Sequence, residues 1–196
     1  IDGQQRLAAL RTKGDHNVMV PSLLYEHISY QRAVKIYHDV NAPGNKRGLT
    51  PGDLLKAELA AGEPTALDLY NRTEELGINI DFDLRSAQRS PVNIRAVAAM
   101  RHVYRIGGGE HYTRVLRALK EAFPEDPARF NQTLLKGMHL FLFRFGSRVT
   151  DREVIDKLRG VTTEDIARKA AAWAELSRGD RASYTGRAIH SQINSG

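Results

Sequence analysis

Ten residues decide the expected fold of the first part of the chain: Ile1-Asp2-Gly3-Gln4-Gln5-Arg6-Leu7-Ala8-Ala9-Leu10. An apolar residue leads into an Asp-Gly turn, two amides and an arginine follow, and a small apolar stretch begins a helix. Such a strand–turn–helix places backbone N–H groups, an acid and an arginine at one helix N-terminus, which suits a phosphate ligand. In the alternative interpretation, Asp2 only caps the following helix and Arg6 lies at the surface. Because a strand ending in Ile-Asp-Gly normally has residues before it, we expect this sequence to be part of a longer chain.

Composition places the chain among soluble proteins. Its 196 residues are 41% hydrophobic and 27% charged, and no apolar run approaches the roughly 20 residues that span a membrane. The absence of cysteine excludes disulfides, thiol catalysis and cysteine zinc sites. The histidines show no metal-ligand spacing, so no zinc site is predicted. Without a secretory signal, a cytoplasmic location with no membrane partner is expected.

The positive charge is concentrated in one segment. Residues 85–120 hold 8 Lys/Arg against 1 Asp/Glu, whereas residues 1–84 hold 9 against 12 and residues 121–196 hold 12 against 10. Such a block favours nucleic acid, and the alternative is a solvated helix face whose arginines lie along apolar surface. Tyr104 and Tyr112 are candidates for stacking on bases, and His102 and His111 have either a phosphate-binding or a structural role. The candidate nucleic-acid contacts are Arg85, Arg89, Arg95, Arg101, Arg105, Arg114 and Arg117.

Periodicity and capping signals predict a short α/β unit followed by helices. Helices are expected over residues 7–13, 30–40, 51–61, 64–76, 91–104, 110–123, 127–145, 151–158 and 163–176. Strands are expected over 17–25 and 78–82, the second as half of a hairpin. Ser29 and Thr50 are the predicted caps of two helices. The glycines at 107–109 predict a turn between helices, and residues 177–196 predict a poorly ordered tail.

The opening run resembles the IDGQQR/DGQHR signature of the ParB/sulfiredoxin-like superfamily, in its branch of phage and actinobacterial ParB-like and DndB-like proteins. The resemblance continues at residues 18–24, 39–41, 46–47, 49–51 and 60–66, and covers about residues 1–80. One departure is Gln5, where many members have histidine, so a role that needs an imidazole is not carried over.

The resemblance implies a nucleotide site, with ATP or CTP and Mg²⁺ as cofactors. It assigns Asp2 a catalytic or metal-holding role and Arg6 a phosphate-binding and catalytic role. The other implied nucleotide contacts are Gly3, Gln4, Gln5, Asn41, Lys46 and Arg47. For the last two, an exposed loop is the alternative.

We therefore expect an α+β, helix-rich protein in three parts. Residues 1–52 are the C-terminal half of a ParB/sulfiredoxin-like core, residues 53–176 an α-helical domain with the basic segment 85–120, and residues 177–196 a flexible tail. The resemblance implies a nucleotide-binding protein, with hydrolysis as an open question, that acts on or near DNA. A metal-dependent nuclease, a non-catalytic DNA-binding protein of the partition type and a structural or interaction protein stay as alternatives, and self-association stays open.

Overall fold

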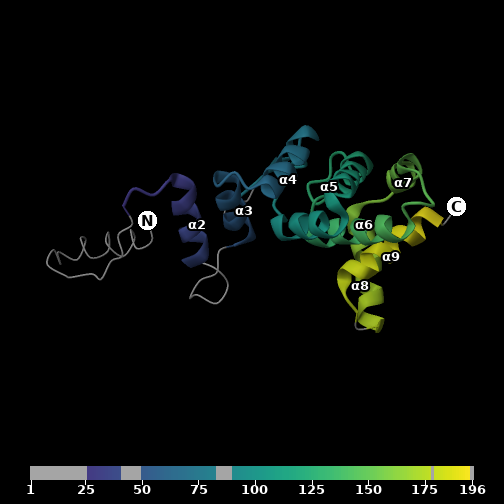
Figure 1. Cartoon of the computed structure of the whole chain (residues 1–196). Helices are drawn as coiled ribbons and strands as arrows, with labels where there is room; N and C mark the ends of the chain where they lie inside the picture. The colour runs from purple at the N-terminus through teal and green to yellow at the C-terminus, as the bar shows by residue number, and fades with distance from the viewer. Residues whose placement is uncertain (1–25, 41–49, 83–89, 178, 195–196) are drawn as a thin grey trace. The chain divides into compact units, whose positions relative to one another are not determined.

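The computed structural model describes residues 26–40, 50–82, 90–177 and 179–194, and over these residues the protein is helix-rich with one two-stranded sheet. The helices there are α2 (Tyr30–Val40), α3 (Pro51–Ala60), α4 (Pro64–Glu75), α5 (Val97–Ala122), α6 (Gln132–Phe145), α7 (Asp151–Leu158), α8 (Thr163–Ser177) and α9 (Arg181–Asn194), and the strands are β1 (Asn79–Ile80) and β2 (Asn93–Ile94) (Figure 1). In this described part, no helix is long and apolar enough to cross a membrane.

The chain divides into two compact units after Glu63, later than the expected boundary after residue 52. The first unit contains α2 and α3, which contact each other, and the second contains everything from α4 onward. The expected α/β core at residues 1–52 falls largely on residues outside those described.

The helices of the first unit begin where their caps predict. The hydroxyl of Ser29 accepts from the backbone N–H of Arg32 at 3.2 Å. Thr50 and Asp53 form a reciprocal capping box at the start of α3, with Pro51 at the first helical position. Both predicted caps are confirmed.

The sheet consists of two short parallel strands. Asn79 pairs with Asn93 and Ile80 with Ile94, and the side chain of Ile94 is fully buried. The predicted strand is confirmed at its centre, but the expected hairpin is wrong because the partner runs parallel. β2 also lies where a helix was expected from residue 91, and α5 begins only at Val97. A two-residue parallel pairing depends on contacts distant in sequence, so no local pattern indicates it.

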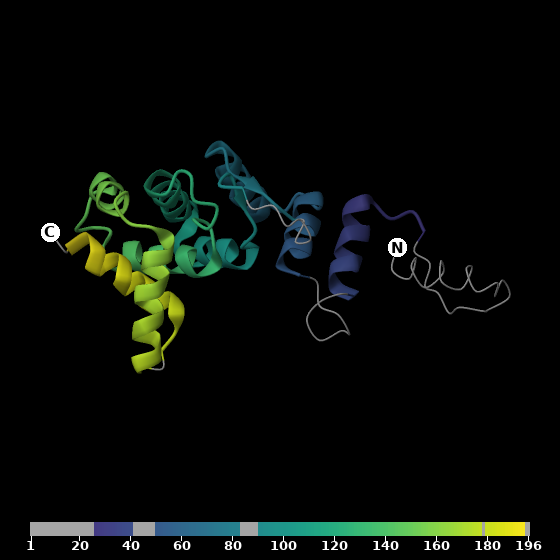
Figure 2. The ribbon, with the colours of Figure 1, turned by 180° about the vertical axis from the view of Figure 1, so that it is seen from behind.

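Helix α6 is central to the core of the second unit, because it packs against both α5 and α9 (Figure 1). Its side chains Leu135 and Met138 are fully buried, as are Leu116 and Leu119 of α5 and Ile189 of α9. Helix α8 lies against α9 in both views (Figure 2). The apolar surface that holds this unit together therefore comes from the consecutive helices α5 and α6 and from α9, which is distant from them in sequence.

The C-terminal segment forms a packed helix where an irregular tail was expected. α9 buries Ala182, Thr185 and Ile189, and it meets α6 at glycines. A Cβ added to Gly137 would lie 2.4 Å from the Cγ2 atom of Thr185, and one added to Gly186 would lie 3.0 Å from the carbonyl oxygen of Gly137. The contact is made by small residues that let two backbones approach, so it lacks the stripe of large apolar side chains by which an amphipathic helix is recognised.

The start of α6 is also later than expected, at Gln132 in place of residue 127. Asn131 caps the helix by accepting from the backbone N–H of Leu134 at 2.8 Å. Before it, the buried guanidinium of Arg129 donates to the carbonyl oxygens of Phe123 and Lys120 at 3.1 and 3.3 Å. These bonds hold the segment between α5 and α6 in a turn, because a buried guanidinium requires acceptors.

Candidate functional site

Three histidine rings meet where α5 packs against α6. His102 and His111 come from α5 and His139 from α6, and the ring centroid of His139 lies 5.9 Å from that of His102 and 5.0 Å from that of His111. The Nε2 atom of His111 is 2.8 Å from Nδ1 of His139, a hydrogen bond in which one neutral ring donates and the other accepts. His139 is only 2% exposed, so the cluster reaches into the packed interior.

The glycine run shapes this cluster. Gly108 has φ 75° and ψ 175°, a conformation essentially restricted to glycine, and it interrupts the helical path inside α5. A Cβ on Gly107 would lie 2.3 Å from the Cδ2 atom of His111, so this position leaves room for the imidazole. The predicted break between two helices at these glycines is therefore confirmed, as a kink at Gly108 between the two helical halves of α5.

Burial lowers the pKa of all three imidazoles. The pKa of His139 is lowered to about 4, mainly by burial and to a smaller extent by the electrostatic effect of His111 and His102. The pKa of His111 is also lowered, by burial first and then by the charge of Arg114. The pKa of His102 is lowered mainly by burial. At neutral pH the three rings are therefore neutral, and the positive charge of this region belongs to its arginines and lysines.

Two cations border the histidines. Arg105 of α5 is exposed and Lys136 of α6 is partly exposed, and both charges contribute to the lowered pKa of His102. Neither cation has an ion-pair partner within the described ranges. Their charge is therefore available to an external anion.

An aromatic ring completes the border. Phe143 of α6 is 64% exposed, and its ring centroid lies 6.0 Å from that of His111 and 5.7 Å from that of His139. We call the resulting group of six residues the histidine face: His102, Arg105, His111, Lys136, His139 and Phe143. It combines neutral hydrogen-bonding rings, an exposed aromatic and two positive charges.

A different network connects α5 to α4. The guanidinium of Arg72 donates to Asp68 and to Glu110, each at 2.8 Å, and the hydroxyl of Tyr104 donates to Asp68 at 2.5 Å. A Cβ on Gly109 would lie 2.5 Å from the Nε atom of Arg72, so this glycine makes room for the guanidinium. Glu110, the one acid of residues 85–120, is thereby bound to α4.

The arginines predicted to contact nucleic acid differ in their surroundings. Arg95 forms an ion pair with Asp81 at 2.6 Å. Arg114 donates to Asp151 at 2.5 Å and to the carbonyl oxygen of Gly146 at 3.0 Å, which attaches α5 to α7. Arg101 is partly buried, and Arg105 and Arg117 are exposed. The remaining predicted site residues lie outside the described residues: Asp2, Gly3, Gln4, Gln5, Arg6, Asn41, Lys46, Arg47, Arg85 and Arg89.

The two tyrosines expected to stack on bases are both hydrogen-bonded within the fold. Tyr112 is fully buried, with its hydroxyl 2.7 Å from that of Thr73. The Thr73 hydroxyl donates to the carbonyl oxygen of Leu69 at 2.7 Å, so Tyr112 must donate to Thr73. Tyr104 is partly buried and bound to Asp68. The aromatic ring that the structure does expose here is Phe143.

Sequence reasoning missed three members of the histidine face because they lie outside the basic segment. Lys136, His139 and Phe143 come from a stretch whose pattern is typical of a buried apolar helix. Their spacing of three and then four residues is the available signal, since it places them on one side of α6. In the described part of the chain, no group of His, Asp and Glu side chains is arranged to hold a metal ion.

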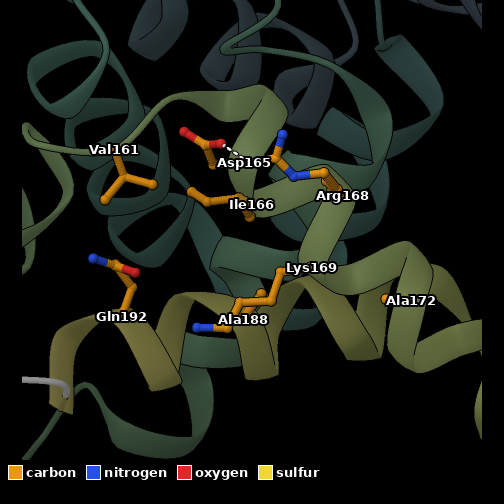
Figure 3. A pocket seen from close by; sticks show the side chains of 8 residues that line it. All are labelled: Val161, Asp165, Ile166, Arg168, Lys169, Ala172, Ala188 and Gln192. Carbon is orange, nitrogen blue, oxygen red and sulfur yellow. Dashed lines mark hydrogen bonds and ion pairs between the residues drawn. The ribbon is translucent and has the colours of Figure 1, made fainter.

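A groove of about 340 Å³ lies between α8 and α9 (Figure 3). Its charged groups are already bound within the protein, because Arg168 forms an ion pair with Asp165 and the Nζ atom of Lys169 donates to the Ser191 hydroxyl at 3.0 Å. The groove is lined by Val161, Asp165, Ile166, Arg168, Lys169, Ala172, Ala188 and Gln192. With its cations engaged, it is a weaker anion site than the histidine face.

Comparison with known proteins identifies a family for this chain. Residues 1–185 match the model of DUF6551, which is described as a family of unknown function. No curated protein and no solved structure matches the chain.

Proposed function

Because the chain belongs to the DUF6551 family, which carries no assigned activity, we propose its function from its own residues. It is a ParB-like, nucleotide-binding protein that contacts nucleic acid, with DNA as the expected partner, through the histidine face. The nucleotide part rests on the DGQQR motif and its resemblance to the signature of the ParB/sulfiredoxin-like superfamily. The nucleic-acid part rests on the described residues.

One observation carries the nucleic-acid part. Arg105 and Lys136 lie near the same imidazole, and neither has an acidic partner within the described ranges, whereas Arg72, Arg95 and Arg114 are all engaged by carboxylates. Cations left without acids on a folded surface attract polyanions, and phosphate contacts supply most of the affinity of non-specific nucleic-acid binding. The unpartnered charge and the basic block of the sequence therefore indicate the same class of ligand.

Salt-dependent DNA binding tests this part. We would measure the anisotropy of labelled DNA between about 50 and 200 mM salt for the wild type and the double variant Arg105→Gln/Lys136→Gln. The variant should bind more weakly, and its slope of log affinity against log salt should be shallower by roughly two, because two fewer phosphates are neutralised. The matched control, Arg152→Gln/Lys157→Gln on α7, removes the same formal charge elsewhere and should keep the wild-type slope.

Two results would overturn the nucleic-acid part. The first is the absence of DNA binding by the wild type at the lowest salt. The second is an equal change of slope in both double variants, which would show that only net charge matters.

Calorimetry with ATP, CTP and GTP in the presence of Mg²⁺ tests the nucleotide part. Arg6→Ala should abolish binding while the helical content stays unchanged, because arginine binds phosphate oxygens through paired hydrogen bonds. Asp2→Ala should weaken binding only when Mg²⁺ is present, if the carboxylate holds the metal. A wild type that binds none of the three nucleotides would contradict this part. It would favour either a nuclease, which predicts metal-dependent cleavage without nucleotide, or a non-catalytic DNA-binding protein.

A further inference from the structure

The exposed ring of Phe143 is held in place by other rings. A single exposed apolar side chain is ordinary on a protein surface, but this one has neighbours that fix its orientation. His111 stands at 87° to the ring with centroids 6.0 Å apart, and His139 lies 5.7 Å away at 48°. His111 and His139 are in turn hydrogen-bonded to each other.

This support matters for binding a flat ligand. A side chain that is already ordered loses little rotamer freedom when a ligand stacks on it, so more of the stacking energy appears as affinity. Phe143 keeps 64% of its surface open while its neighbours hold it. The ring is therefore preorganised as a stacking surface.

Positive charge lies along the same side of α6. Lys136 precedes Phe143 by seven residues, or two turns, which places the two on one face about 10 Å apart along the axis. No acidic residue occurs in α6, and Glu110 at the kink of α5 is bound to Arg72. The surroundings of the ring therefore favour a ligand that is both aromatic and anionic.

We infer that the histidine face binds single-stranded nucleic acid, with a base stacked on Phe143 and neighbouring phosphates held by Lys136 and Arg105. The inference rests on the proposed nucleic-acid function and adds the form of the ligand. In a duplex the faces of the bases are covered by their neighbours and only edges are open, whereas an unpaired strand offers free base faces to an aromatic side chain.

An acidic peptide with an apolar anchor is the competing ligand for such a surface. It would meet the same cations, and a leucine or valine would cover Phe143 as well as a base does. The nucleic-acid ligand is favoured because the wider sequence is basic over residues 85–120, as is typical of proteins that bind nucleic acid. The experiment below separates these two ligands.

The test compares three probes of equal length: a single-stranded oligothymidine, a duplex, and a single strand with abasic sites that keeps the phosphates and lacks bases. The full chain is titrated with each, as wild type, Phe143→Leu and Phe143→Trp. Tyr30→Leu is the matched control, because Tyr30 is 70% exposed on α2, in the other unit.

The expected result is a preference of about ten-fold for the oligothymidine over the abasic strand, since base–aromatic stacking is worth roughly that much per base. Phe143→Leu should remove this preference, Phe143→Trp should retain it, and Tyr30→Leu should leave it unchanged. In a Trp173→Phe background, the indole introduced by Phe143→Trp should be quenched by the oligothymidine and not by the abasic strand.

Three outcomes are decisive against the inference, and they differ in what they leave standing. If all three probes bind equally and Phe143→Leu changes nothing, the face binds phosphates only, and the proposed nucleic-acid function survives without the single-strand inference. If no probe binds, both fail together. If an acidic, leucine-containing peptide binds in the same titration while no nucleic acid does, the face belongs to a protein partner.

Discussion

The two sides of α5 at its glycine kink differ in whether their cations form ion pairs. Toward α4, the guanidinium of Arg72 is bound by two carboxylates, and one of these also accepts from Tyr104. Toward α6, Arg105 and Lys136 lie beside neutral imidazoles, and neither cation forms an ion pair with an acid of the described residues. Both sides depend on the same glycines, because Gly107 makes room for His111 and Gly109 for Arg72.

The difference separates structural from ligand-binding polar groups. Groups whose charges are neutralised within the fold hold helices together, and removing one leaves its partner unsatisfied. Cations left without partners give little to the fold and keep their charge for a ligand. The basic block of the sequence contains both kinds, and only three-dimensional contacts distinguish them.

Acid should affect the histidine side first, and this is the largest effect we expect. The pKa of His139 is about 4 in the folded protein and 6.5 ordinarily, so between these values the unfolded chain binds more protons. The contribution of His139 to stability is therefore full well above pH 6.5 and is lost as the pH drops through this window. From neutral pH to about pH 5 the loss from His139 is at most about 2 kcal/mol, measured by urea unfolding at each pH.

Two variants test whether His139 causes this loss of stability. His139→Gln removes the titrating ring and should flatten the dependence between pH 7 and about 5. The pKa of Asp68 is lowered from its ordinary 3.8, first by the hydrogen bond from Tyr104 and then by that from Arg72, so its contribution is lost only at more acidic pH. Asp68→Asn should therefore leave the slope between pH 7 and about 5 unchanged. A wild type equally stable at both pH values would contradict the buried neutral cluster.

The kink should tolerate no side chain. Gly108→Ala places a Cβ at φ 75°, ψ 175°, and we expect a loss of roughly 1–2 kcal/mol from backbone strain, although the site has open space around it. Gly160→Ala is the control, because that glycine also has open space but no positive φ. It should be neutral or slightly stabilising. Equal effects in thermal unfolding would show that α5 does not need the kink.

The buried hydroxyl pair on the α4 side should contribute less. Tyr112→Phe removes the donor to Thr73, whose hydroxyl keeps its own bond to Leu69, so a loss of about 1 kcal/mol is expected in urea unfolding. Tyr30→Phe, which removes a hydroxyl from a side chain that is 70% exposed, should be neutral. A neutral Tyr112→Phe would mean that the hydroxyl pair adds nothing to the contact between α4 and α5.

Local chemistry made part of the fold predictable. The sequence Thr50-Pro51-Gly52-Asp53 contains every element of the capping box that begins α3, so its start follows from neighbouring residues alone. The parallel pairing of β1 with β2 depends on segments separated along the chain. The packing of α9 depends on glycines of two helices meeting, which composition along one helix does not indicate.

Of the candidate site, the sequence predicted only the excess of positive charge. The basic block over residues 85–120 indicates an anionic ligand. Which arginines are free to contact it depends on residues outside this block, because Asp81 forms an ion pair with Arg95 and Asp151 forms one with Arg114. The exposed ring comes from α6, where Phe143 looks like one more core residue in an apolar run. The DGQQR motif stays a prediction, because its residues lie outside those described.

The smallest effects should separate the two sides most cleanly. Arg72→Gln breaks bonds to Asp68 and Glu110, so it should lower stability by less than Tyr112→Phe and leave nucleic-acid affinity within about two-fold, because this guanidinium is already neutralised. Arg105→Gln should show the reverse, with unchanged stability and a salt slope shallower by about one. Anisotropy and urea unfolding on the same two preparations measure both quantities. Equal weakening of nucleic-acid binding by the two variants would mean that the ion-paired Arg72 contributes to binding as much as Arg105 does. The presence of ion pairs would then not explain a functional difference between the two sides of α5.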